Sequence, residues 1–118
     1  MNTPDTANQR RAQRKRAPFS ALVTDVISGK PLGQLGNLST TGLLVICSQP
    51  PRSEALYQVS LPLPESGLGI DAATPIELGI QEQWQEITAS SSQIWAGYRI
   101  VAITDVDAAR LDYWLGKP

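Results

Sequence analysis

Two segments in the second half of the chain alternate apolar and polar residues with a period of two. Residues 57–63 and 76–84 both follow this pattern, which is typical of strands with one buried face. Pro62 predicts an edge position for the first strand. In the second strand Trp84 continues the inward apolar phase after Glu82 interrupts it. Beyond a serine-rich turn, residues 94–103 predict a strand that returns alongside it.

Three further apolar segments precede these strands. Residues 19–27 and 32–38 flank a Ser-Gly-Lys-Pro turn and therefore predict a β-hairpin. Residues 43–47 form a short continuous apolar run, which favours a strand covered on both faces. The chain thus has about six short strands, as expected for an all-β barrel or sandwich.

A helix is predicted at the C-terminal end. Thr104 is a suitable N-cap, and Asp105 and Asp107 place negative charge in the first turn. A helical apolar stripe follows, formed by Val106, Ala109, Leu111, Tyr113, Trp114 and Leu115. Strands followed by one terminal helix point to an antiparallel barrel or sandwich with the helix packed on one opening.

Length and composition indicate one globular domain. The chain has 118 residues, of which 42% are hydrophobic and 18% charged. Residues 1–9 are polar, and we expect them to be disordered. The sequence has no apolar leader and no run long enough to cross a membrane, so we expect a cytoplasmic protein without membrane insertion.

The chemistry available for catalysis is sparse. The chain lacks histidine, and Cys47 is its single cysteine, which argues against a metal site of usual spacing. Cys47 ends an apolar run and is best interpreted as a small buried hydrophobe. The sequence has no nucleophile elbow and no phosphate loop, and its carboxylates are scattered, so we expect no enzymatic activity.

Charge divides the chain into a basic arm and an acidic body. Residues 1–16 carry a net charge of +4, and residues 17–118 carry −5. The arm contains four arginines within seven residues, which favours bidentate recognition of phosphate or of a guanine edge: Arg10, Arg11, Arg14 and Arg16. A solvated tail is the alternative. A nucleic-acid polymer ranks lower as a partner, because the body is acidic.

A polar turn, NLSTTG, separates two of the apolar runs. Asn37 and Ser39 provide short donors and acceptors at alternate positions, and Gly42 permits close approach of the backbone. An ordinary turn between strands is the alternative interpretation. Trp84, between two glutamines, is a candidate for stacking on a ligand, although tryptophan is more often part of a core.

Taken together, the arm and the turn resemble the PilZ domain, a bacterial family of cyclic di-GMP receptors. That family has an RxxxR segment before the first barrel strand and a D/N-x-S-x-x-G turn after it. Residues 37–42 match the turn at every defined position, and residues 10–14 match the arginine segment. A second register stays open, in which Arg11 and Arg16 form the pair with one additional residue between them. Gly97 and the closing helix extend the resemblance over nearly the whole chain.

The resemblance implies a mainly β fold, a six-stranded antiparallel PilZ-type β-barrel with a C-terminal α-helix. The domain would span residues 10–118, with a ligand-clasping arm at 10–18, the barrel at 19–103 and the helix at 105–116. It implies no cofactor and one ligand, cyclic di-GMP, bound by Arg10, Arg11, Arg14, Arg16, Asn37, Ser39, Gly42 and, by stacking, Trp84.

The resemblance also implies a switch. Binding would order the arm, and because no output domain accompanies the barrel, an unidentified effector protein would receive the signal in motility, pilus or biofilm control. The alternative is a PilZ-fold adaptor of pilus or flagellar machinery that does not bind cyclic di-GMP.

Overall fold

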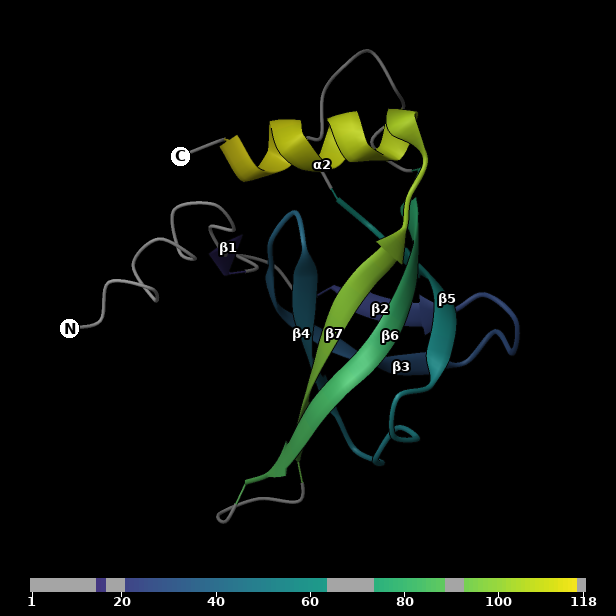
Figure 1. Ribbon diagram of the computed structural model, residues 1–118, viewed down its shortest axis with the longest axis vertical. Coiled ribbons are helices and arrows are strands. Elements are labelled where there is room, and N and C mark those ends of the chain that lie inside the picture. Colours follow the sequence, from purple (N-terminus) through teal and green to yellow (C-terminus); the bar gives the residue numbers. More distant parts are fainter. Residues whose placement is uncertain (1–14, 17–20, 64–73, 89–92, 117–118) are drawn as a thin grey trace, which may run out of the picture.

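The computed structural model describes residues 15–16, as backbone only, together with residues 21–63, 74–88 and 93–116. Six strands form a barrel, and one helix follows them (Figure 1): β2 (Leu22–Asp25), β3 (Pro31–Leu38), β4 (Gly42–Cys47), β5 (Leu56–Leu61), β6 (Ile76–Ile87), β7 (Ile94–Ala102) and α2 (Asp105–Gly116). A two-residue strand, β1 (Lys15–Arg16), pairs with β3. The expected tail at residues 1–9 and most of the arm lie outside the described residues.

All strand pairs are antiparallel, and the sheet closes on itself. The order runs β3, β2, β5, β6, β7, β4, and β4 pairs again with β3. The prediction of a six-stranded antiparallel barrel with a C-terminal helix is confirmed. The edge position predicted from Pro62 is wrong, because β5 is bonded to β2 on one side and to β6 on the other. The strand ends at Leu61, so the proline removes no ladder hydrogen bond.

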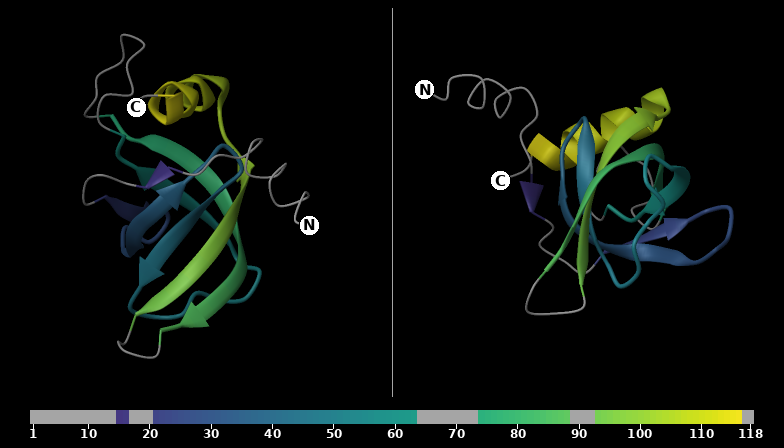
Figure 2. Two further views of the ribbon diagram at one scale, coloured as in Figure 1. Left: turned by 90° about the vertical axis from the view of Figure 1, so that its left-hand side faces the viewer. Right: turned by 60° about the horizontal axis from the view of Figure 1, so that its bottom comes forward.

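Alternation directs one side of each strand into the barrel, and that side is mainly apolar. Val59 and Leu61 of β5 and Ile76, Leu78 and Ile80 of β6 have no exposed surface. Helix α2 lies across one opening of the barrel, as Figures 1 and 2 show. Its Leu111 and Trp114 join the core and close that end.

The helical stripe expected from the sequence is only partly correct. Leu111 and Trp114 are buried as predicted, whereas Val106 is 59% exposed and Tyr113 is 45% exposed. Arg110 is buried instead, at 1% exposure. The buried face is therefore rotated relative to the predicted stripe, and it contains a charged residue.

Arg110 is buried because it has two oxygen partners, one just before β6 and one on α2 itself. Its guanidinium donates to the carbonyl oxygen of Thr74 and lies 3.7 Å from the Asp107 carboxylate. Asp107 also accepts a hydrogen bond of 3.0 Å from the amide of Glu77 in β6. These bonds offset the desolvation of the charge and hold α2 against the start of β6.

Candidate ligand-binding site

A row of directly paired residues crosses the outer face of the barrel. Asn37 of β3 pairs with Leu44 of β4, Leu44 pairs with Gly97 of β7, and Gly97 pairs with Trp84 of β6. On the far side of Asn37 the same row continues in β1, where the backbone of Arg16 is the partner. Strand pairing therefore brings the backbone of Arg16, the start of the NLSTTG turn at Asn37, and Trp84 into one row.

Two β-bulges produce this alignment. One lies between Leu35 and Asn37, and the other lies between Glu82 and Trp84. A bulge adds one residue to one strand and reverses the side to which the following side chains point. Glu82 is accordingly 3% exposed and Trp84 is 48% exposed. The prediction that Trp84 continues the inward phase is wrong, because the extra residue, Gln83, turns it outward.

The indole of Trp84 lies over Gly97 on the neighbouring strand. A Cβ atom at position 97 would overlap Nε1 and Cε2 of the indole. One side of the ring is therefore covered by a backbone without a side chain, and almost half of the residue's surface remains exposed. An aromatic ring held in this way can stack on a planar base.

The NLSTTG turn is stabilised by Ser39, which is completely buried. Its Oγ accepts hydrogen bonds from the amides of Thr41, at 3.2 Å, and Gly42, at 3.1 Å. Its own amide donates to the carbonyl oxygen of Gly42 at 2.9 Å. The hydroxyl thus occupies the interior of the turn, an arrangement common for serine in tight turns.

Gly42 is required by the approach of β4 to β7. A Cβ atom at this position would overlap the carbonyl oxygen of Tyr98. Only glycine permits this close spacing of the two strands. Ser39 and Gly42 together therefore fix the shape of the turn that carries Asn37.

A hollow of about 340 Å³ lies on this outer face. Three residues expected from the sequence line it, namely Asn37, Gly42 and Trp84, whereas Ser39 is buried and does not line it. Arg16 is described only as backbone, and Arg10, Arg11 and Arg14 lie outside the described residues.

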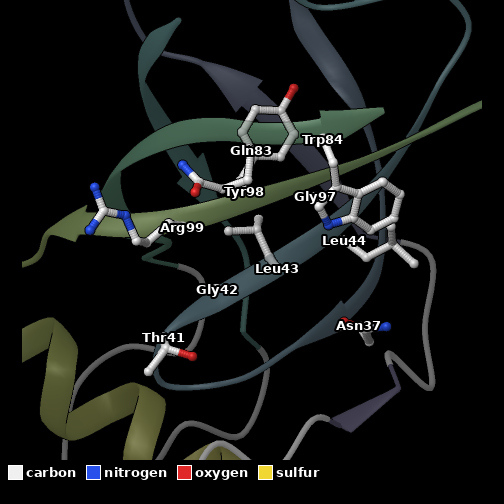
Figure 3. A pocket seen from close by; sticks show the side chains of 10 residues that line it. All are labelled: Asn37, Thr41, Gly42, Leu43, Leu44, Gln83, Trp84, Gly97, Tyr98 and Arg99. Carbon is white, nitrogen blue, oxygen red and sulfur yellow. The ribbon is translucent and has the colours of Figure 1, made fainter. Parts of the chain in front are cut away.

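The two ends of the hollow differ in chemistry (Figure 3). Leu44 and Gly97 lie beside Trp84 at one end, whereas Thr41 and Arg99 lie at the other. Sequence reasoning missed Arg99, because it is a single charge in an otherwise regular strand. The alternation of β7 does mark it as outward-facing, but the pairing that places it beside Gly42 is not readable from the sequence.

Buried polar groups lie on the inner side of the same strands. The Glu82 carboxylate accepts a 2.7 Å hydrogen bond from the amide of Glu54, which has a positive φ of 59°. Tyr98 packs edge-on against Tyr57, with ring centroids 6.1 Å apart. Burial raises the pKa of the Tyr98 hydroxyl and that of the Cys47 thiol. Cys47 is 3% exposed, so its interpretation as a buried hydrophobe is confirmed.

Within the described ranges no group of three or more Cys, Asp or Glu side chains is arranged to hold a metal ion. Among the described residues, no helix is long and apolar enough to span a bilayer.

Comparison with known proteins identifies the fold. No protein-family model and no curated protein matches the chain. The inhibitor of motility MotI/DgrA from Bacillus subtilis superimposes with a TM-score of 0.68 and 18% identity, over 91% of this chain and 49% of that protein. The chain thus spans about half the length of that neighbour.

A second solved structure is the PilZ domain of YcgR from Escherichia coli with c-di-GMP. It matches with a TM-score of 0.59 and 15% identity, over 89% of this chain and 87% of that domain. The closed antiparallel barrel with its terminal helix therefore has the PilZ-type fold. At this level of identity the likeness establishes the fold.

Proposed function

We propose that this chain is a bacterial, cytoplasmic cyclic di-GMP receptor that acts through a partner protein. The observation that carries the proposal is the cross-strand row, which brings Asn37 and Trp84 to one hollow and sets the backbone of Arg16 beside Asn37. The YcgR domain of the same fold was solved with this ligand.

Each group in the row suits one part of the dinucleotide. Trp84 stacks on a guanine, and Asn37 hydrogen-bonds to a guanine edge. Ser39 and Gly42 act through the turn that presents Asn37. The arm pairs with phosphate oxygens and with the N7 and O6 atoms of guanine through Arg10, Arg11, Arg14 and Arg16.

The size of the hollow supports a role for the arm. Its volume of about 340 Å³ is near the lower end for small-molecule sites. The barrel wall therefore contacts only part of a dinucleotide, and the arm covers the rest. Two phosphates neutralise the repulsion among the arginines, so binding orders the arm and creates a surface that an effector protein recognises.

The chemistry of the hollow supports binding without catalysis. Its lining contains no carboxylate and no thiol among the residues that the structure describes. The lining therefore lacks the carboxylates and thiols that commonly serve as general acids, bases or nucleophiles, and it has the aromatic, amide and guanidinium groups that recognise a nucleotide.

The first prediction concerns selectivity. In calorimetric titrations cyclic di-GMP should bind, whereas cyclic di-AMP and GTP should bind at least about tenfold more weakly, because each lost polar contact costs about 1–3 kcal/mol. Equal affinity for the two cyclic dinucleotides would exclude base reading by Asn37 and the arm. No binding of either would favour the ligand-free adaptor.

The second prediction identifies the arginine pair. If Arg10 and Arg14 are the pair, alanine at either position should weaken binding at least about tenfold, as expected for lost charge-assisted hydrogen bonds. Lys15→Ala, which removes one charge from the same arm, is the matched control and should have a much smaller effect. Severe losses at Arg11 and Arg16 instead would establish the second register.

A tail that acts by charge alone predicts a different result. All five substitutions would then weaken binding by similar small amounts, and added salt would remove those differences. Such a uniform result, with Asn37→Ala and Ser39→Ala both silent, would contradict the proposed receptor.

A further inference from the structure

Arg99 lies at the polar end of the hollow, on the opposite side from Trp84 (Figure 3). It is an exposed residue of β7 whose direct partners are Gly42 in β4 and Gln81 in β6. Because Gly42 has no side chain, nothing on β4 stands beside the arginine at this level of the sheet. Arg99 therefore remains exposed at this end of the hollow, where its guanidinium is directed toward Gln81.

A chain of hydrogen bonds orients the guanidinium. The buried carboxylate of Glu82 accepts from the amide of Glu54. The carbonyl oxygen of Glu54 then accepts from Nε2 of Gln81, at 3.2 Å, and Oε1 of Gln81 accepts from Arg99, also at 3.2 Å. Because Nε2 of Gln81 is engaged by a carbonyl, its oxygen must face the arginine.

The charge of Arg99 has no acidic partner in the described part of the chain. The ion pair between Arg110 and Asp107 is the one found there, so no described carboxylate lies within 4.0 Å of the Arg99 guanidinium. Gln81 is a neutral acceptor and engages one nitrogen. Arg99 is itself exposed at the rim of the hollow, so its charge is open to solvent there.

Thr41 completes this end of the hollow. Its carbonyl oxygen accepts a 2.8 Å hydrogen bond from the amide of Ile100, which joins the turn to β7 next to Arg99. The Thr41 hydroxyl lies 3.3 Å from Oγ of Ser39. A hydroxyl and a guanidinium at one end, with an aromatic ring and Leu44 at the other, match a phosphate and a purine respectively.

We infer that Arg99 and Thr41 form a phosphate subsite on the barrel wall, separate from the arginines of the arm. The inference rests on the proposed function and assigns an orientation to the ligand. A guanine lies at the end formed by Trp84 and Leu44, and one phosphate of the dinucleotide lies against Arg99.

The test is calorimetric titration of the full chain with cyclic di-GMP. Arg99→Ala should lower the affinity at least about tenfold, because a charge-assisted hydrogen bond to phosphate is lost. Arg99→Lys keeps the charge and should stay within about threefold of the unaltered protein, since lysine binds phosphate as a point charge. Arg52→Ala removes an exposed arginine that does not line the hollow and should leave the affinity unchanged.

The possible outcomes separate the inference from the function on which it rests. Normal affinity of Arg99→Ala, with binding by the unaltered protein, overturns the phosphate subsite and leaves the receptor intact. If Arg99→Lys is as weak as Arg99→Ala, the site requires the planar guanidinium and not its charge alone, and the inferred point-charge contact with phosphate is wrong. No binding by the unaltered protein overturns the proposed function, and the subsite with it.

Discussion

Replacing Trp114 by alanine should lower the free energy of unfolding by about 3–5 kcal/mol, the range for large aromatic residues removed from a core. Trp114 is 3% exposed and belongs to the same core cluster as the inward residues of the barrel. It also lies on the only helix that the described residues contain, so its loss opens one end of the barrel. Chemical denaturation followed by far-ultraviolet circular dichroism measures the change.

Val106→Ala is the matched control on the same helix. Val106 is 59% exposed, so its truncation should change the free energy of unfolding by no more than about 0.5 kcal/mol. Comparable losses for the two variants would show that α2 does not close the core. The contrast also tests the rotation of the buried face relative to the stripe expected from the sequence.

The barrel was predictable because residues that face its interior alternate with residues that face outward along each strand. Inward residues must be apolar at every second position, and residues 57–61 and 76–80 obey that pattern. The helix was predictable from its N-cap and first-turn acids. Its buried face was not, because Arg110 is buried through oxygen partners that the fold supplies.

The candidate site was predictable only in part, and bulges are the main reason. The motif identified Asn37 and Gly42, which line the hollow. A bulge changes the phase of a strand without a clear sequence signal, so Trp84 was assigned to the wrong face even though it was named as a stacking candidate. Arg99 was missed because its significance depends on pairing with Gly42 across β4 and β7.

Ser39 illustrates a different limit. The motif places it among ligand-binding residues, whereas its hydroxyl is buried and bonded to the backbone of the turn. A sequence motif records that a residue is needed in a pattern. It does not distinguish a residue that would contact a ligand from one that holds such a residue in place.

Gly97→Ala should weaken cyclic di-GMP binding about as much as Trp84→Ala does, although alanine adds only one methyl group. The three atoms nearest to a Cβ atom at position 97 all belong to the Trp84 indole. The added methyl group therefore displaces the ring from its place over β7. Base stacking on an aromatic ring is worth about 1–3 kcal/mol, so each variant should lose about fivefold to 150-fold in affinity.

The double variant tests whether the two residues act together. If Gly97 acts through the indole, Gly97→Ala should have no further effect on affinity once Trp84 is alanine, and the two losses should be strongly non-additive. If Gly97 instead lets the ligand approach the β7 backbone directly, Gly97→Ala will cost the same affinity with and without Trp84. Titration calorimetry on the four proteins of this cycle separates these cases.

Stability provides an independent readout of the same contact. A glycine within a strand lowers the free energy of unfolding of the protein by about 0.5–1 kcal/mol relative to alanine at the same position. In the Trp84→Ala background no indole opposes the methyl group, so Gly97→Ala should raise the free energy of unfolding by about that amount. With Trp84 present, the overlap with the indole should remove this gain. An equal gain in both backgrounds would mean that the ring does not rest on Gly97, and the stacking platform would then lack its structural basis.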